Sequence, residues 1–286
     1  MNHYLIPKGY SDFIPSESQQ KSDILGTLAD IYTKNHFSLI STPTVELVSS
    51  LETAMTPNLL QQSVRFQDAF GQHVVLRPDH TVPIARIVAS RMTNDPLPLK
   101  LFYQSPIFRQ PLKNTTSRDA TDIEQFQSGL EIIGDASIHA ELSLLQVCVS
   151  ALKALNISNV HIDIGHADFI QALSPELQQA LIAGDYLALG YIPERGGRHL
   201  VTNHPQLSAL SDQLEALKLA AMVSYNQGLV KGIHYYTGTL FEIYSKDTKR
   251  VIATGGRYDS LLKSFGFDQP AVGLAFNVSE LMEYVS

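Results

Sequence analysis

The spacing of apolar side chains predicts several amphipathic helices. Ser16 follows Pro15 and is expected to cap the first of them. Behind it, apolar positions recur at the intervals of a single helix face at Ile24, Leu25, Leu28, Ile31 and Tyr32. We therefore expect a helix over residues 16–32. Similar spacing predicts helices over residues 81–92, 139–155, 257–265 and 278–285.

Other segments alternate in polarity or are rich in β-branched and aromatic residues, as strands are. Residues 64–69 and 73–78 flank a Phe-Gly-Gln turn and are expected to form a hairpin. Further strands are predicted over residues 37–48, 99–108, 126–134, 159–166, 221–226, 234–245, 250–256 and 271–277.

Two segments show neither the helical nor the strand pattern over more than a few residues. Residues 110–125 are polar and are expected to form an exposed loop. Residues 167–221 are broken by Pro175, Gly184 and the loop GYIPERGGRH into short helical pieces. Strands with short turns and interspersed helices are typical of an α+β fold, with an antiparallel sheet flanked by helices. The sequence therefore predicts one domain over residues 1–286, interrupted by a helical insertion at about 167–221.

Composition narrows the class of protein. The chain has 286 residues, of which 44% are hydrophobic and 17% charged, and this describes a globular protein. Its net charge of −7 lacks the basic surplus that binds nucleic acid backbones, so no nucleic acid partner is expected. No apolar run approaches the ~20 residues of a membrane helix, and no secretion signal is expected. The single cysteine, Cys148, is expected to be buried in a cytoplasmic protein.

The motifs of common catalytic and cofactor sites are absent from the sequence. There is no GxxxxGK[ST] or GxGxxG phosphate loop, no HExxH metal pair and no Gly-x-Ser-x-Gly nucleophile turn. The ten histidines are expected mostly in loops or facing solvent. We therefore expect no catalytic nucleophile, no metal and no cofactor.

Five stretches, in chain order, resemble the catalytic core of histidyl-tRNA synthetases and their synthetase-like relatives. They are PKGYSDFIP; ISTPTVEL; LRPDHTVPIAR; LFYQSPIFRQ with EQFQSGLEIIG; and KGIHYYTGTLFE with ATGGRYDSLL and PAVGLAF. Together they span nearly the whole chain. The resemblance implies a class II aminoacyl-tRNA synthetase-like fold.

The resemblance also implies a pocket for free L-histidine. Asp79, Thr81 and Gln127 match the positions that hold the ammonium group, and Arg109 matches the position that meets the carboxylate. Glu131 and Tyr236 match the partners of the two imidazole nitrogens, and Tyr235 matches the wall of the ring. The implied histidine-binding set is Asp79, Thr81, Arg109, Gln127, Glu131, Lys231, Tyr235 and Tyr236.

Three departures separate the chain from the synthetases. Glu280 stands where the third motif ends in an arginine that holds the triphosphate of ATP. Lys231 replaces an arginine and loses its planar geometry, and His234 replaces an aspartate. The chain ends soon after the third motif, so no anticodon-binding domain is expected. With HIDIGHADFIQAL, these features resemble the regulatory subunits of ATP phosphoribosyltransferase.

That resemblance implies a non-catalytic regulatory subunit. The implied partner is the short-form catalytic subunit, and the implied effector is L-histidine, which would inhibit the first step of its own biosynthesis. The implied assembly is a homodimer within a hetero-oligomer. Two alternatives stay open: a stand-alone histidine-activating (adenylating) enzyme, and a histidine-binding sensor for another system.

Without the resemblance, the same residues have ordinary structural interpretations. Tyr235 and Tyr236 would be packed strand aromatics, Glu131 would face solvent, and Asp79 would cap a helix.

Overall fold

The structure is a computed structural model of the chain. It describes residues 6–52, 54–55, 57–111, 122–183, 185–229, 235–247 and 250–285. The strands are β1 (Ser38–Leu39), β2 (Val45–Leu47), β3 (Arg65–Gln67), β4 (His73–Leu76), β5 (Leu99–Phe108), β6 (Glu124–Ile133), β7 (Val160–His166), β8 (Arg195–Gly196), β9 (Val223–Asn226), β10 (Thr239–Ser245), β11 (Val251–Arg257) and β12 (Ala271–Asn277). The helices are α1 (Pro15–Lys34), α2 (Val48–Glu52), α3 (Pro57–Gln61), α4 (Thr81–Arg91), α5 (Ile138–Ala154), α6 (Ala167–Gln171), α7 (Pro175–Ala183), α8 (Tyr186–Leu189), α9 (Pro205–Ala216) and α10 (Val278–Met282), with the 3-10 turns η2 (Arg198–Leu200), η3 (Ala220–Met222) and η4 (Leu262–Phe265).

Within the described ranges, nine strands form the central sheet, in the order β1-β5-β6-β12-β11-β10-β7-β9-β8. Neighbouring strands run antiparallel except β1 with β5 and β7 with β9, which run parallel. The predicted α+β fold class is therefore confirmed, and the sheet is mixed rather than wholly antiparallel. A second sheet has the order β2-β4-β3 and contains the predicted hairpin of β3 and β4.

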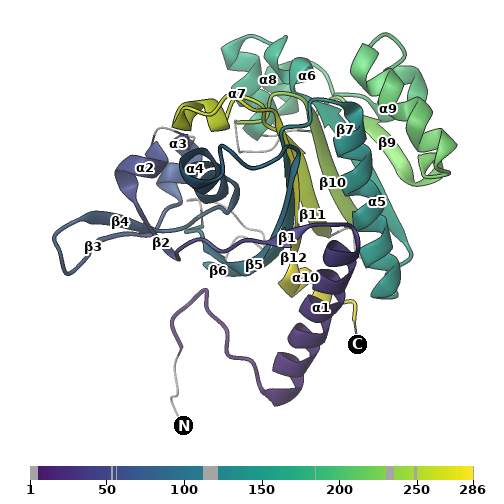
Figure 1. The fold of residues 1–286 in the computed structure, drawn as a ribbon. Coiled ribbons are helices and arrows are strands. Elements are labelled where there is room, and N and C mark those ends of the chain that lie inside the picture. Colours follow the sequence, from purple (N-terminus) through teal and green to yellow (C-terminus); the bar gives the residue numbers. More distant parts are fainter. Residues whose placement is uncertain are drawn as a thin grey trace.

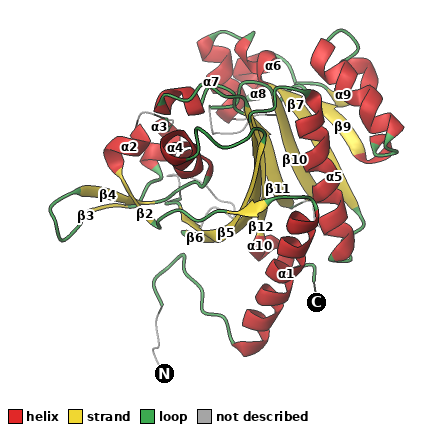
Figure 2. Cartoon of the chain, in the orientation of Figure 1, coloured by secondary structure: helices red, strands yellow, loops and turns green. Residues whose placement is uncertain are grey.

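Helices cover both faces of the central sheet (Figures 1 and 2). On one face, α1, α5, α9 and α10 bury their apolar residues against the sheet in one cluster, which includes Leu28, Leu145 and Phe241. On the other face, α2, α3, α4 and η4 build a second cluster with Leu101 and Ile133. Cys148 of α5 is fully buried, as expected. Among the described residues, no helix has both the length and the apolar character needed to cross a bilayer.

The start of α1 corrects one expectation. The helix begins at Pro15 and its cap is Ile14, so Ser16 lies inside the first turn instead of capping it. The carboxylate of Glu17 accepts the backbone N–H of Ile14 at 2.9 Å and takes over the capping contact. Proline is favoured at the first helical position because its missing N–H would have no partner there.

The segments around β10 and β11 correct two more expectations. Strand β10 begins at Thr239, so Tyr235 and Tyr236 precede the strand and do not belong to it. The helix predicted over residues 257–265 is reduced to η4. Residue Arg257 ends β11, and the backbone N–H of Tyr258 donates to the carbonyl of Ala271 at 2.7 Å, which keeps the chain extended beside β12.

The segment 167–221 contains the predicted short helices, α6 to α9. It also contributes β8, which pairs with β9 at one side of the sheet. Gly184 lies outside the described residues. The division into one core and an insertion stays a prediction. The loop predicted over residues 110–125 lies mostly outside the described residues, and its last two residues belong to β6.

Candidate functional site

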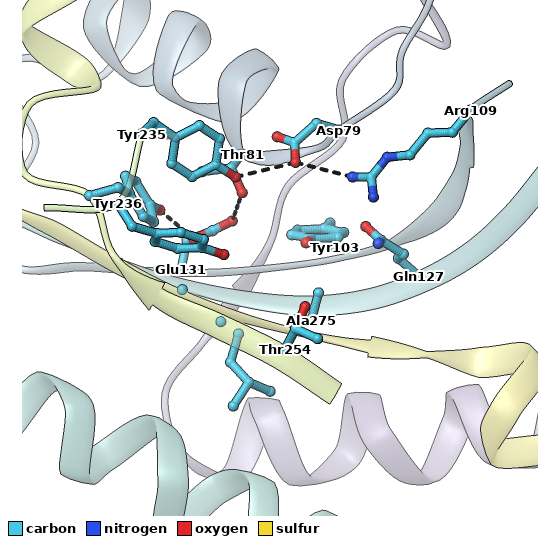
Figure 3. A pocket seen from close by; sticks show the side chains of 14 residues that line it. Asp79, Thr81, Tyr103, Arg109, Gln127, Glu131, Tyr235, Tyr236, Thr254 and Ala275 are labelled. Atoms are coloured by element: carbon cyan, nitrogen blue, oxygen red, sulfur yellow. Dashed lines mark hydrogen bonds and ion pairs between the residues drawn. The ribbon is translucent and has the colours of Figure 1, made fainter. Parts of the chain in front are cut away.

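A polar cavity of about 50 Å³ lies on the α4 side of the sheet, between the start of α4 and strands β5, β6, β11 and β12 (Figure 3). Its lining includes seven of the eight residues of the implied histidine-binding set, and these are Asp79, Thr81, Arg109, Gln127, Glu131, Tyr235 and Tyr236. Lys231 lies outside the described residues, as does His234. The structure thus brings together positions up to 157 residues apart along the chain.

Asp79 precedes α4 and faces the cavity. Its Oδ1 accepts the backbone N–H of Val82 at 3.1 Å, so the expected helix-capping contact is confirmed. Its Oδ2 lies 3.6 Å from Nη2 of Arg109 and accepts the hydroxyl of Tyr235 at 3.3 Å. Nε of Arg109 donates to the carbonyl of Pro78 at 2.6 Å, which holds the guanidinium beside Asp79. One end of the cavity therefore carries an anion and a cation side by side.

Glu131 of β6 lies at the other end and is 1% exposed, so the alternative interpretation, in which it faces solvent, is wrong. Its Oε1 accepts the hydroxyl of Thr81 at 2.9 Å, and its Oε2 accepts the hydroxyl of Tyr258. Burial raises the pKa of this carboxyl to about 8, although the two hydroxyl donors act in the opposite direction. The Glu131 carboxyl group is therefore mostly protonated at neutral pH.

Tyrosines form much of the wall. Tyr235 lies 5.1 Å from Tyr236 and 5.6 Å from Tyr258, measured between ring centroids. Burial is the main cause that raises the pKa of each of these three phenols and of Tyr103. In Figure 3, Tyr235 and Tyr236 lie at one end of the cavity and Arg109 with Gln127 at the other. Such a wall is neutral at physiological pH and presents aromatic faces that attract a cation.

Glycines allow the polar groups to lie close to the sheet. A methyl group at Gly273 of β12 would overlap the Glu131 carboxylate, which lies against the backbone there. A methyl group at Gly256 of β11 would lie 2.8 Å from the Tyr236 ring. Gly256 and Gly273 therefore make room for side chains of the site rather than for a turn.

Tyr103 and Tyr258 were missed as lining residues. Tyr258 contacts Glu131, and Tyr103 stacks on His80 with ring centroids 4.2 Å apart. His80 is buried, against the expectation for most histidines, and burial together with the charge of Arg77 lowers its pKa to about 3. Both tyrosines fall in stretches that carry the resemblance, LFYQSPIFRQ and ATGGRYDSLL. Both residues can be located in the sequence, but the sequence does not show that their side chains point into the cavity.

A second cavity, of about 210 Å³, adjoins the first. Both are lined by Arg109, Gln127, Thr254 and Ala275, and the second continues to Asn277 and Glu280. The Glu280 carboxylate lies 3.4 Å from Nη1 of Arg250. An anion therefore lines the compartment next to the candidate site.

One histidine cluster has spacing close to that of a metal site. The ligand atoms of His166, Asp168 and His204 lie within 4.8 Å of one another, and His166 is buried, which again departs from the solvent-facing expectation. However, Nδ1 of His166 accepts the N–H of Asp168 at 3.2 Å, and Nδ1 of His204 accepts the N–H of Leu207 at 3.3 Å. A neutral imidazole that accepts at Nδ1 carries its proton on Nε2 and cannot ligate a metal there. These hydrogen bonds describe caps of α6 and α9.

Comparison with known proteins places this geometry in a family. The family model described as histidyl-tRNA synthetase matches residues 9–186 and 195–281. The ATP phosphoribosyltransferase regulatory subunit of Clostridium botulinum is 32% identical, over 97% of this chain and 75% of that protein. The chain belongs to the family of ATP phosphoribosyltransferase regulatory subunits. A regulatory subunit from Carboxydothermus hydrogenoformans is 27% identical, over 98% of this chain and 96% of that protein.

Solved structures agree with membership in the regulatory-subunit family. A protein from Bacillus halodurans, named ATP phosphoribosyltransferase regulatory subunit/histidyl-tRNA synthetase, is 26% identical with a TM-score of 0.87, over 99% of this chain and 83% of that one. Apo histidyl-tRNA synthetase of S. aureus is 20% identical with a TM-score of 0.72, over 98% of this chain and 69% of that one, and shows the same fold. The expected class II synthetase-like fold is confirmed.

Proposed function

We propose that this chain is the non-catalytic regulatory subunit that a short-form ATP phosphoribosyltransferase catalytic subunit requires. In this proposal it binds free L-histidine in the cavity beside α4 and transmits feedback inhibition to the first step of L-histidine biosynthesis in the cytoplasm. The observation that carries the proposal is the buried Glu131 carboxyl at one end of the cavity, opposite the Asp79–Arg109 pair at the other.

The charged end suits the two groups that all amino acids share. The carboxylate of Asp79 and the side-chain oxygen of Gln127 are acceptors for an α-ammonium group. Arg109 is a fixed donor for an α-carboxylate, because its Nε is already held by Pro78. The ligand class supported by this end is therefore a free α-amino acid.

The other end suits an imidazole. A ring with two polar nitrogens loses affinity in a buried site unless each finds a partner. Glu131 supplies an acidic partner, and the Tyr236 hydroxyl supplies a group that both donates and accepts. A purely apolar side chain would offer neither group a hydrogen bond. These contacts favour histidine over leucine or phenylalanine.

The adjoining cavity argues for regulation rather than amino-acid activation. A triphosphate needs positive groups as charge moves onto the leaving pyrophosphate. The described lining of the compartment next to the proposed histidine site has one cation, Arg109, and one anion, Glu280, which lies 3.4 Å from Arg250, so it offers a triphosphate no surplus of positive charge. One observation favours the alternative of a histidine-adenylating enzyme: the adjoining cavity, of about 210 Å³, is large enough to extend the proposed histidine site.

The relatives' names and the surface support the proposed partners. Regulatory subunits imply a catalytic subunit, and we propose a homodimer within a larger hetero-oligomer. The exposed apolar side chains of Val45, Leu47 and Phe66, which are 39%, 40% and 43% exposed on the β2-β4-β3 sheet, support self-association across this sheet. Coupling is reciprocal, so substrates of the catalytic partner that oppose inhibition should weaken histidine binding.

Calorimetric titration with L-histidine tests the ligand. We expect saturable binding that Glu131→Ala weakens by about 2 kcal/mol or more, because a buried charged partner is lost. Glu124→Ala is the matched control, since Glu124 is exposed on the same strand. Binding that is equally tight in all three proteins would refute the assigned site.

Mixing with a short-form catalytic subunit tests the partner. We expect one complex on gel filtration, higher turnover than the catalytic subunit alone, and inhibition by L-histidine. If no complex forms while histidine still binds, the chain is a sensor for another system. Histidine-dependent ATP–pyrophosphate exchange by the isolated chain would instead establish the adenylating enzyme.

A further inference from the structure

The charges of the described residues that line the cavity do not balance. Arg109 is the one cation among these lining residues, and it lies beside Asp79. Glu131 faces Thr81 of α4, Tyr103 of β5, Tyr235 and Tyr236 before β10, and Tyr258 after β11, and none of these is cationic. Among the described residues that line the cavity, Glu131 therefore has no positively charged partner.

The hydrogen bonds around Glu131 nevertheless fit its ionised form. Both carboxylate oxygens accept a hydroxyl proton, one from Thr81 and one from Tyr258. A carboxylate is acceptor-only, so two donors suit it better than they suit the protonated acid. The pKa of Glu131 is raised by burial, and the negative charge of Asp79 adds to this effect. A ligand that brings a positive charge would act against both.

We propose that the cavity binds histidine as the imidazolium ion, paired with an ionised Glu131. This inference rests on the proposed histidine site. On binding near neutral pH, the proton leaves a Glu131 carboxyl oxygen and is carried by the ring, so the O–H bond breaks and a ring N–H bond forms. Histidine with an ammonium, an imidazolium and a carboxylate then balances Asp79, Glu131 and Arg109, so the charges of the described lining residues and the ligand sum to zero.

The charge balance dictates how affinity depends on pH. Free imidazole titrates at about 6.5, and the empty-site carboxyl titrates at about 8. Between these values the complex and its free components hold the same number of protons, so affinity is constant. Below the lower value binding releases a proton, and above the higher value it takes one up. Affinity therefore falls on both sides, up to tenfold per pH unit.

Titration of the full chain with ¹⁵N-labelled L-histidine, by calorimetry and NMR, tests the inference. At pH 8 we expect the bound ring to show the imidazolium signature, and we expect affinity to be level from about pH 6.5 to 8. In Glu131→Gln the bound ring should be neutral, and the loss of affinity that starts near pH 8 should disappear. The α-ammonium also titrates at alkaline pH, and because it does so in both proteins the comparison isolates Glu131.

The possible results distinguish the imidazolium inference from the proposed histidine site. A neutral ring in the wild-type complex at pH 8, or the same pH profile with and without Glu131, overturns the imidazolium inference and leaves the histidine site standing. Absence of histidine binding at every pH overturns the proposed site and the inference together. The NMR signature of the wild-type complex decides the point even where the variant fails to fold.

Discussion

Glu131→Gln isolates what one buried carboxyl contributes to the stability of the ligand-free protein. The amide has nearly the same shape as the acid. Its oxygen can accept one of the two hydroxyl protons from Thr81 and Tyr258, and its NH₂ can donate to the other hydroxyl oxygen. The substitution therefore removes the titration while keeping both contacts.

The sign of the effect follows from the raised pKa. Burial raises the pKa of folded Glu131 from the usual 4.5 to about 8. Between those values the unfolded chain has lost this proton and the folded chain has kept it, so stability falls as pH rises. The slope for one group is about 1.4 kcal/mol per pH unit. Over the two pH units from about 5.5 to 7.5, wild type should therefore lose roughly 3 kcal/mol more than the variant.

Urea unfolding at several pH values, at one protein concentration, measures the difference. The titrations of other groups, including the buried His80, are present in both proteins and cancel in the comparison. Glu124→Gln, on the exposed end of the same strand, should follow wild type. Parallel stability curves for wild type and Glu131→Gln would refute the claim that the empty cavity holds a protonated acid.

Three further predictions follow from other contacts in the structure. Gly273→Ala should reduce histidine affinity at least tenfold in calorimetry, because the added methyl group overlaps the Glu131 carboxylate. Gly26→Ala is the control and should leave histidine affinity unchanged, since no atom lies within 4 Å of the added methyl group. Equal losses of affinity in the two variants would argue against the overlap with Glu131. Arg257→Lys should lower the urea-unfolding free energy by about 2 kcal/mol, since lysine cannot reproduce the two 2.6 Å contacts to Glu141; no loss would contradict a tight buried pair. Burial also raises the pKa of Cys148, so a thiol reagent should label it only after denaturation, and rapid labelling of the folded chain would contradict that burial.

Local pattern predicted most elements because period and polarity are local properties of a chain. Helix α5 and strands β5 and β12 begin and end within two residues of their expected limits. The predicted elements are wrong where a contact with another strand overrides the local preference for a helix or a strand. The apolar spacing of residues 257–265 suits a helix, but Tyr258 is held beside Ala271, a contact that no local pattern contains.

The members of the candidate site could be chosen from sequence only through resemblance. Asp79 and Glu131 each have an ordinary structural interpretation, and for Asp79 the capping contact is present together with the cavity contact. The sequence did not identify Tyr258 as a site residue, because nothing in the stretch RYDSLL predicts that its hydroxyl points at a carboxylate of β6.

The types and order of most helices and strands follow from the amino-acid pattern, as do the absence of common catalytic motifs and the likeness to histidyl-tRNA synthetases. The protonation of Glu131, the pairing of Asp79 with Arg109 and the room left by Gly273 follow only from the folded arrangement. The physical reason is that desolvation and charge pairing depend on distances between groups from different strands. Those distances exist only after β6, β11 and β12 have paired beneath α4.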